Sequence, residues 1–96
     1  MMPYIKKEDR PQYDKDLDPL IQTLLKNTAF GQKNTGHSVY CLYKILRIVY
    51  ELGNFEAKSN VYKILKSCEN EFNKNVMDPY EEIKKKENGD VVFESN

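Results

Sequence analysis

The chain has 96 residues, of which 40% are hydrophobic and 31% are charged, and its 15 basic side chains balance its 15 acidic ones. This length and composition predict one globular domain rather than a disordered tail. The formal net charge of zero disfavours binding to duplex DNA through bulk charge, because that mode needs clustered Lys and Arg.

The N-terminal residues 1–17 are polar and contain Pro3 and Pro11, which predicts an arm with at most one short helical turn. Asp18-Pro19 is typical of a helix start, since aspartate caps free N–H groups and proline fits the first helical position. Apolar residues follow at helical spacing, which predicts a first helix over about 18–28: Leu20, Ile21, Leu24 and Leu25. Residues 27–37, with Gly31 and Gly36, predict a loop.

The second predicted helix, about 37–52, is apolar over most of its circumference. A first seam follows heptad-like spacing and consists of Val39, Leu42, Leu46 and Val49. A second seam on the neighbouring arc consists of Cys41, Ile45, Ile48 and Leu52. Such a helix must be covered on most sides, either by two flanking helices or by one helix and a second copy of the chain. Gly53 is expected to end it in the left-handed conformation.

A third helix is predicted over about 59–77, with an apolar face that starts at Val61 and Ile64. Asp78-Pro79 repeats the start signal of the first helix, which predicts a kink or short break and then a short polar helix over about 79–87. Residues 88–96 form the predicted C-terminal tail, with an apolar tip at 91–93. The expected fold is therefore all-α: a small three-helix bundle (18–28, 37–52, 59–77) with a short fourth helix and polar terminal arms.

Residues with catalytic chemistry are few. The single histidine, His37, is more typical of a capping or surface residue than of a base or ligand. Cys41 and Cys68 lie within apolar helical patterns, which predicts two small buried side chains. Neither their spacing to His37 nor any glycine-rich loop matches a nucleophile, zinc or phosphate-binding pattern. We therefore expect a protein that is not an enzyme and has no catalytic residue, metal or cofactor.

The N-terminus lacks the apolar core of a signal peptide, and no apolar run approaches the roughly 20 residues that span a bilayer. We therefore expect a cytoplasmic protein with reduced thiols and no membrane partner.

A stripe of aromatic and basic residues is the one candidate ligand site. Tyr40, Tyr43, Arg47 and Tyr50, here called the Tyr/Arg stripe, share one side of the second predicted helix, with Lys44 beside them. Tyrosine rings stack on nucleic-acid bases and cations hold phosphate, and Tyr62 and Tyr80 are candidates to join this surface. The alternative interpretation is that these rings border the core or fill an oligomer interface.

Both ends of the chain carry the segments of one family. The chain resembles an uncharacterised family of short bacterial, archaeal and phage proteins through residues 4–10 with Tyr13-Asp14, and through residues 79–82 and 86–91: Tyr4-Ile5-Lys6-Lys7-Glu8-Asp9-Arg10, Pro79-Tyr80-Glu81-Glu82 and Lys86-Glu87-Asn88-Gly89-Asp90-Val91. The central helices, including Cys68-Glu69, also fit its pattern, whereas the Tyr-rich second helix and the tail after 92 depart from it. The resemblance implies a shared fold and a prokaryotic or phage origin, without a known activity.

Two functions follow as hypotheses. The first is a non-enzymatic helical binding protein that acts as a homo-oligomer with an unidentified ligand. The alternative is a phage-type protein that sequesters a nucleotide-derived signal molecule, or binds nucleic acid, through the Tyr/Arg stripe. In that case it would act in the host cytoplasm.

Overall fold

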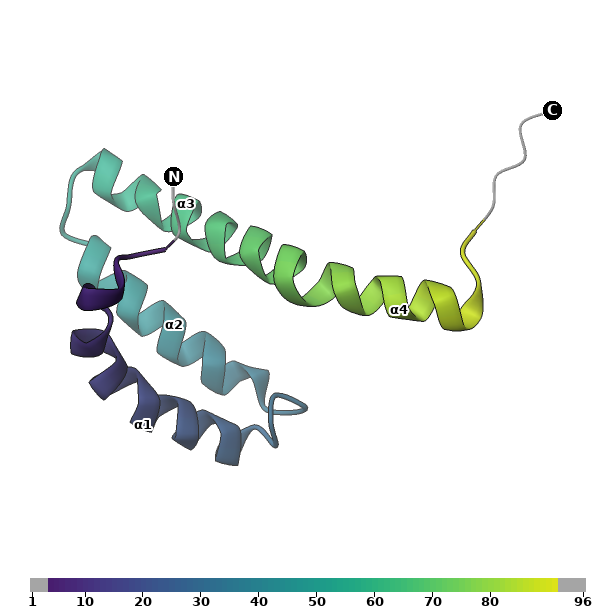
Figure 1. Cartoon of the computed structure of the whole chain (residues 1–96). Helices are drawn as coiled ribbons and strands as arrows, with labels where there is room; N and C mark the ends of the chain where they lie inside the picture. Colours follow the sequence, from purple (N-terminus) through teal and green to yellow (C-terminus); the bar gives the residue numbers. More distant parts are fainter. Residues whose placement is uncertain (1–3, 92–96) are drawn as a thin grey trace. The chain divides into compact units, whose positions relative to one another are not determined.

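The computed structural model describes residues 4–91, and this part of the chain is helical without strands (Figure 1). A short 3-10 helix, η1 (Lys7–Asp9), precedes three long helices, α1 (Pro11–Asn27), α2 (Thr35–Tyr50) and α3 (Phe55–Phe72). A π-helical turn, η2 (Asn73–Met77), joins α3 to α4 (Asp78–Asn88). The all-α prediction is confirmed. None of the helices in the described part is long and apolar enough to cross a membrane.

Residues 2–61 and residues 62–96 form two compact units. The first unit contains η1, α1, α2 and the start of α3, and in it α1 contacts α2. The second contains the rest of α3, η2 and α4. The single domain predicted for the whole chain stays a prediction. Residues 1–3 of the predicted arm, and residues 92 and 93 of the predicted apolar tip, lie outside the described residues.

The start of the first helix was predicted wrongly, because α1 begins at Pro11 rather than at Asp18. Pro11 occupies the first turn, where a missing N–H removes no helical hydrogen bond. Tyr13 and Leu17 extend the apolar stripe of Leu20 and Leu24 backwards at spacings of four and three residues. Residues 11–17 are therefore helical and do not belong to an arm.

Pro19 consequently lies inside α1. An internal proline removes one backbone hydrogen bond and costs a helix about 3 kcal/mol. The helix continues through this position to Asn27, eight residues further on, and the Thr23 hydroxyl donates to the Pro19 carbonyl (3.1 Å). A helix-start signal is thus compatible with a helix interior when the apolar periodicity continues on both sides of it.

The loop between α1 and α2 is organised around Thr28, which is 4% exposed. Its hydroxyl donates to the Leu24 carbonyl (2.6 Å) and accepts from the Gly31 N–H (3.0 Å). Three consecutive residues, Ala29, Phe30 and Gly31, have positive φ angles of 49°, 57° and 85°. Side chains beyond glycine adopt this conformation at a cost, so the hydrogen bonds of Thr28 hold a strained turn.

The turn between α2 and α3 depends on Gly53 and Asn54. The φ of Gly53 is not positive, contrary to the prediction, and the requirement there is space, because an added Cβ would collide with the Ala57 side chain. The Asn54 side-chain oxygen accepts from the Ala57 N–H (2.9 Å), as an N-cap residue does. This cap explains why α3 begins at Phe55, earlier than the predicted start near residue 59.

The predicted break before Pro79 is instead the π-helical turn η2. Pro79 cannot donate to the carbonyl four residues earlier, and its ring crowds that carbonyl. A wider turn directly before the proline relieves the crowding while the backbone stays helical, with φ −62° and ψ −46° at Asp78. The C-terminal helix therefore runs in joined pieces from Phe55 to Asn88.

Apolar side chains remain accessible throughout the described residues. Among residues 4–91 no hydrophobic side chain is buried, and Leu20, Leu24, Leu25 and Leu46 are half-buried. The prediction that both cysteines are buried is wrong, because Cys68 is exposed and Cys41 is half-buried. Within the single chain, α1 and α2 thus cover only part of each other.

Replacement of Thr28 with valine is expected to destabilise the protein by about 1–3 kcal/mol, because it keeps the shape but removes both hydroxyl hydrogen bonds, so that the Gly31 N–H loses its side-chain acceptor. Thr23→Val is the matched control, since its hydroxyl bond is exposed. Urea unfolding followed by circular dichroism at one fixed protein concentration measures the difference. Equal stabilities of the two variants would contradict the role of Thr28.

The two cysteines are expected to differ in reactivity in the folded protein. Iodoacetamide should modify the exposed Cys68 faster than Cys41, and the difference should vanish in concentrated urea. Timed quenching and peptide mass spectrometry measure both rates. Faster modification of Cys41 in the native state would contradict the placement of these side chains.

Candidate functional site

The Tyr/Arg stripe lies on the exposed side of α2 and forms two cation–ring pairs. Lys44 Nζ lies 5.6 Å from the centre of the Tyr40 ring and donates to its hydroxyl (3.4 Å). The Arg47 guanidinium lies 5.9 Å from the centre of the Tyr43 ring, and Nη1 donates to its hydroxyl (3.2 Å). The structure therefore brings Tyr40, Tyr43, Lys44 and Arg47 together, with each cation four residues beyond its ring.

Arg47 also forms an ion pair along the helix. Its Nε lies 3.2 Å from Glu51 Oε1. The hydrogen bond and charge of Glu51 raise the pKa of Arg47 above its usual value, and the Tyr43 hydroxyl adds to the shift. Arg47 is thus permanently cationic, but part of its charge is neutralised on its own helix before any ligand arrives.

The remaining stripe residues lie in different settings. Tyr50 is half-buried at the end of α2. Tyr80 lies on α4 in the second unit, where Lys84 Nζ is 5.6 Å from its ring centre. Tyr62 is exposed on α3. The exposed rings of Tyr40 and Tyr43 are the part of the stripe that can stack on a planar ligand.

The structure shows how much of the apolar surface of α2 is exposed. Six large apolar residues of the two seams are exposed: Val39, Leu42, Ile45, Ile48, Val49 and Leu52. In the second seam the exposed fractions are 46% at Ile45, 68% at Ile48 and 96% at Leu52, while Cys41 is half-buried. A contiguous surface of this kind is typical of a protein interaction site.

Within α2, all of whose residues the structure describes, the partly covered side chains are Ser38, Cys41, Leu46 and Tyr50. At 100° per residue Leu46 and Tyr50 lie about 40° apart on the helix, and Ile48 lies on the opposite side of it. In the second seam, Ile48 is therefore the residue that points farthest from the arc of Leu46 and Tyr50, whereas Cys41 is partly covered.

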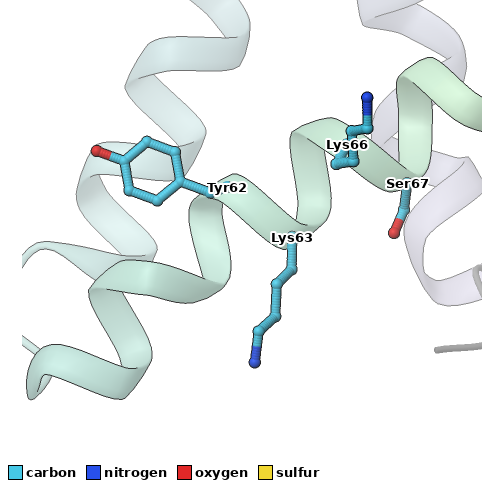
Figure 2. A pocket seen from close by; sticks show the side chains of 4 residues that line it. All are labelled: Tyr62, Lys63, Lys66 and Ser67. Carbon is cyan, nitrogen blue, oxygen red and sulfur yellow. The ribbon is translucent and has the colours of Figure 1, made fainter.

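Two shallow depressions lie on the C-terminal helices. The first is lined by Tyr62, Lys63, Lys66 and Ser67, whose side chains leave α3 in different directions (Figure 2). The second, at the end of α4, contains Lys84 and Lys85. Each of these lysines is paired with a glutamate, Lys84 with Glu87 (3.2 Å) and Lys85 with Glu82 (3.6 Å). Neither depression gathers unpaired polar groups around one point.

His37 lies in the first turn of α2, where its backbone N–H donates to the Asn34 carbonyl (3.0 Å). Over residues 4–91, no group of three or more His, Cys, Asp or Glu side chains is arranged to hold a metal ion.

Comparison with known proteins identifies the family. No curated protein and no solved structure matches the chain. A family model described as a domain of unknown function, DUF6899, matches residues 2–91, which is nearly the whole length. The chain therefore belongs to the DUF6899 family.

Proposed function

We propose that this protein is a non-enzymatic helical binding module that self-associates through the apolar surface of α2. The observation that carries the proposal is the exposure of five large apolar residues on α2, and of Leu52 directly after it, in a chain with no buried apolar side chain among residues 4–91. A domain of this size buries too little surface to be stable with its most apolar helix open to water. A second copy supplies the missing cover.

The size of the effect supports association. Burial of one aliphatic side chain contributes about 1.5–3 kcal/mol, and two copies together offer twelve such side chains on α2 and at Leu52, which follows it. Because most of these side chains are already partly covered, we count half of that total, about 9–18 kcal/mol, whereas association costs about 4–15 kcal/mol in lost freedom of motion. The gain from burial is thus of the size that association requires.

A second candidate function rests on the cation–ring pairs of the Tyr/Arg stripe. Tyr40 and Tyr43 present exposed rings, and Lys44 and Arg47 donate hydrogen bonds to their hydroxyls. This combination suits a nucleotide, whose base stacks on a ring while its phosphate binds a cation. In a phage protein acting in the host cytoplasm, such a surface would sequester a nucleotide-derived signal. The pairing of Arg47 with Glu51 weakens this candidate relative to the first.

The parent chain is expected to be an oligomer at micromolar concentration, and Leu42→Glu/Ile48→Glu is expected to be monomeric. Each substitution places a carboxylate in one of the two seams. Association would remove these carboxylates from water without a partner charge, which costs free energy. Tyr40→Glu/Tyr43→Glu, on the other side of α2, is the matched control and should keep the parent's mass. Sedimentation equilibrium measures all three masses, and a well-folded monomeric parent would overturn the proposal.

For the second candidate, Tyr43→Ala is expected to raise the Kd for a cyclic dinucleotide about tenfold or more, because base–ring stacking is worth about 1–3 kcal/mol. Arg47→Ala should have a comparable effect through loss of a phosphate contact. Tyr62→Ala on α3 is the control and should leave the Kd unchanged. Isothermal titration calorimetry gives these constants; a parent that binds no cyclic dinucleotide or single-stranded oligonucleotide would remove this candidate.

A further inference from the structure

We propose that the second seam of α2 binds the second seam of another copy in an antiparallel orientation, with Lys44 of each copy paired with Glu51 of the other. This inference rests on the proposed self-association and specifies its surface, its partner and its direction. It follows from the exposed apolar side chains of the second seam and from the charges that border them.

The second seam contains Ile48, which points away from the arc of Leu46 and Tyr50, and Leu52, which follows α2 and is 96% exposed. Its members, Cys41, Ile45, Ile48 and Leu52, follow spacings of four, three and four residues. This is the spacing at which two helices interlock their side chains along a shared line of contact. The seam is therefore suited to a helix as its partner.

The spacing of the seam, four, three and four residues, is the same in both directions along the helix. In an antiparallel pair, Ile45 faces Ile48 of the second copy, and Cys41 faces Leu52. The two central residues of the seam thus contact each other across the pair, and so do the two terminal residues. The two-fold axis passes between Leu46 and Arg47. The isologous contact closes on itself and gives a dimer rather than a chain of copies.

Charge complementarity selects the antiparallel direction. Lys44 and Glu51 lie on the same border of the second seam, seven residues apart. In an antiparallel pair these borders meet, so Lys44 of one copy lies beside Glu51 of the other, twice per dimer. In a parallel pair the border with Lys44 and Glu51 faces the opposite border, which carries Leu42 and Val49, and both charges lose this partner.

The existing contacts of both charged groups permit the pair. Arg47 binds one oxygen of Glu51, Oε1, which leaves Oε2 as the acceptor for Lys44 of the second copy. Lys44 is an exposed side chain whose present contact is a 3.4 Å hydrogen bond to the Tyr40 hydroxyl on its own helix. A short rotation of this flexible side chain brings it to the border of the seam. The first seams of the two copies then lie together on one face of the pair.

Disulfide mapping tests the direction. In an antiparallel dimer the two copies of Cys41 are about 16 Å apart along the axis, from eleven residues at 1.5 Å each, which is too far for a disulfide. A cysteine introduced by Leu52→Cys lies opposite Cys41 of the second copy. In a Cys68→Ala background, oxidised Leu52→Cys is expected to form an interchain bond between positions 41 and 52. Trypsin cleaves at Lys44 and Arg47, so mass spectrometry separates the two thiol peptides.

Val49→Cys, in the first seam, is the matched control and should not be linked to Cys41. Bonds joining position 41 to position 41 and position 52 to position 52 would establish a parallel pair and overturn the inference. An oligomer that forms neither set of disulfides would show that the second seam is not the interface, while the proposed self-association would stand. A monomeric parent would overturn both.

A charge exchange tests the ion pairs without cysteines. Lys44→Glu alone and Glu51→Lys alone are each expected to weaken self-association at least tenfold, since like charges then meet twice per dimer. Mixed in equal amounts, the two variants are expected to form a heterodimer, because every repelling pair becomes attractive. Native mass spectrometry with one variant labelled with nitrogen-15 counts homodimers and heterodimers. A statistical mixture of the three dimers would overturn the pairing.

Discussion

The covering of α2 is the constraint on which the rest of this protein depends. A helix with two neighbouring apolar seams needs contacts over most of its circumference, and α1 contacts α2 and supplies part of them. The polar groups of α2 are concentrated on the remaining side, where Tyr40, Tyr43, Lys44 and Arg47 satisfy one another. The apolar sides of α2 are thus used for packing, and its aromatic and basic side is left to contact other molecules.

The periodicity of apolar residues was sufficient to predict the helices, whereas local start and stop signals misplaced some of their ends. Asp18-Pro19 has the composition of a helix start, but Tyr13 and Leu17 continue the stripe before it, and α1 begins at Pro11. Asn54 caps α3 through its side chain, a role that composition alone does not distinguish from that of a turn residue. Gly53 is needed for the space beside Ala57, which becomes visible only once two helices meet.

The candidate site was predictable to the same degree. Spacings of three and four residues placed Tyr40, Tyr43 and Arg47 on one side of a helix, and the structure pairs each cation with a ring. The partial neutralisation of Arg47 by Glu51 depends on side-chain conformations, which spacing does not determine. The exposure of Cys68 was missed, since an apolar pattern predicts which face of a helix is suited to burial but not whether another element reaches it.

The π-helical turn Asn73–Met77 fixes the rotational phase between α3 and α4. A turn closed by bonds five residues apart contains one residue more than an α-helical turn, so everything after it is rotated by about 100°. Ile83 thereby falls in line with Ile64, whereas an uninterrupted α-helix would place it about 100° to one side. The apolar spacing of α4 is shifted by one residue relative to that of α3, and the extra residue of the π-helical turn compensates for this shift. The apolar residues of both segments therefore form one continuous edge.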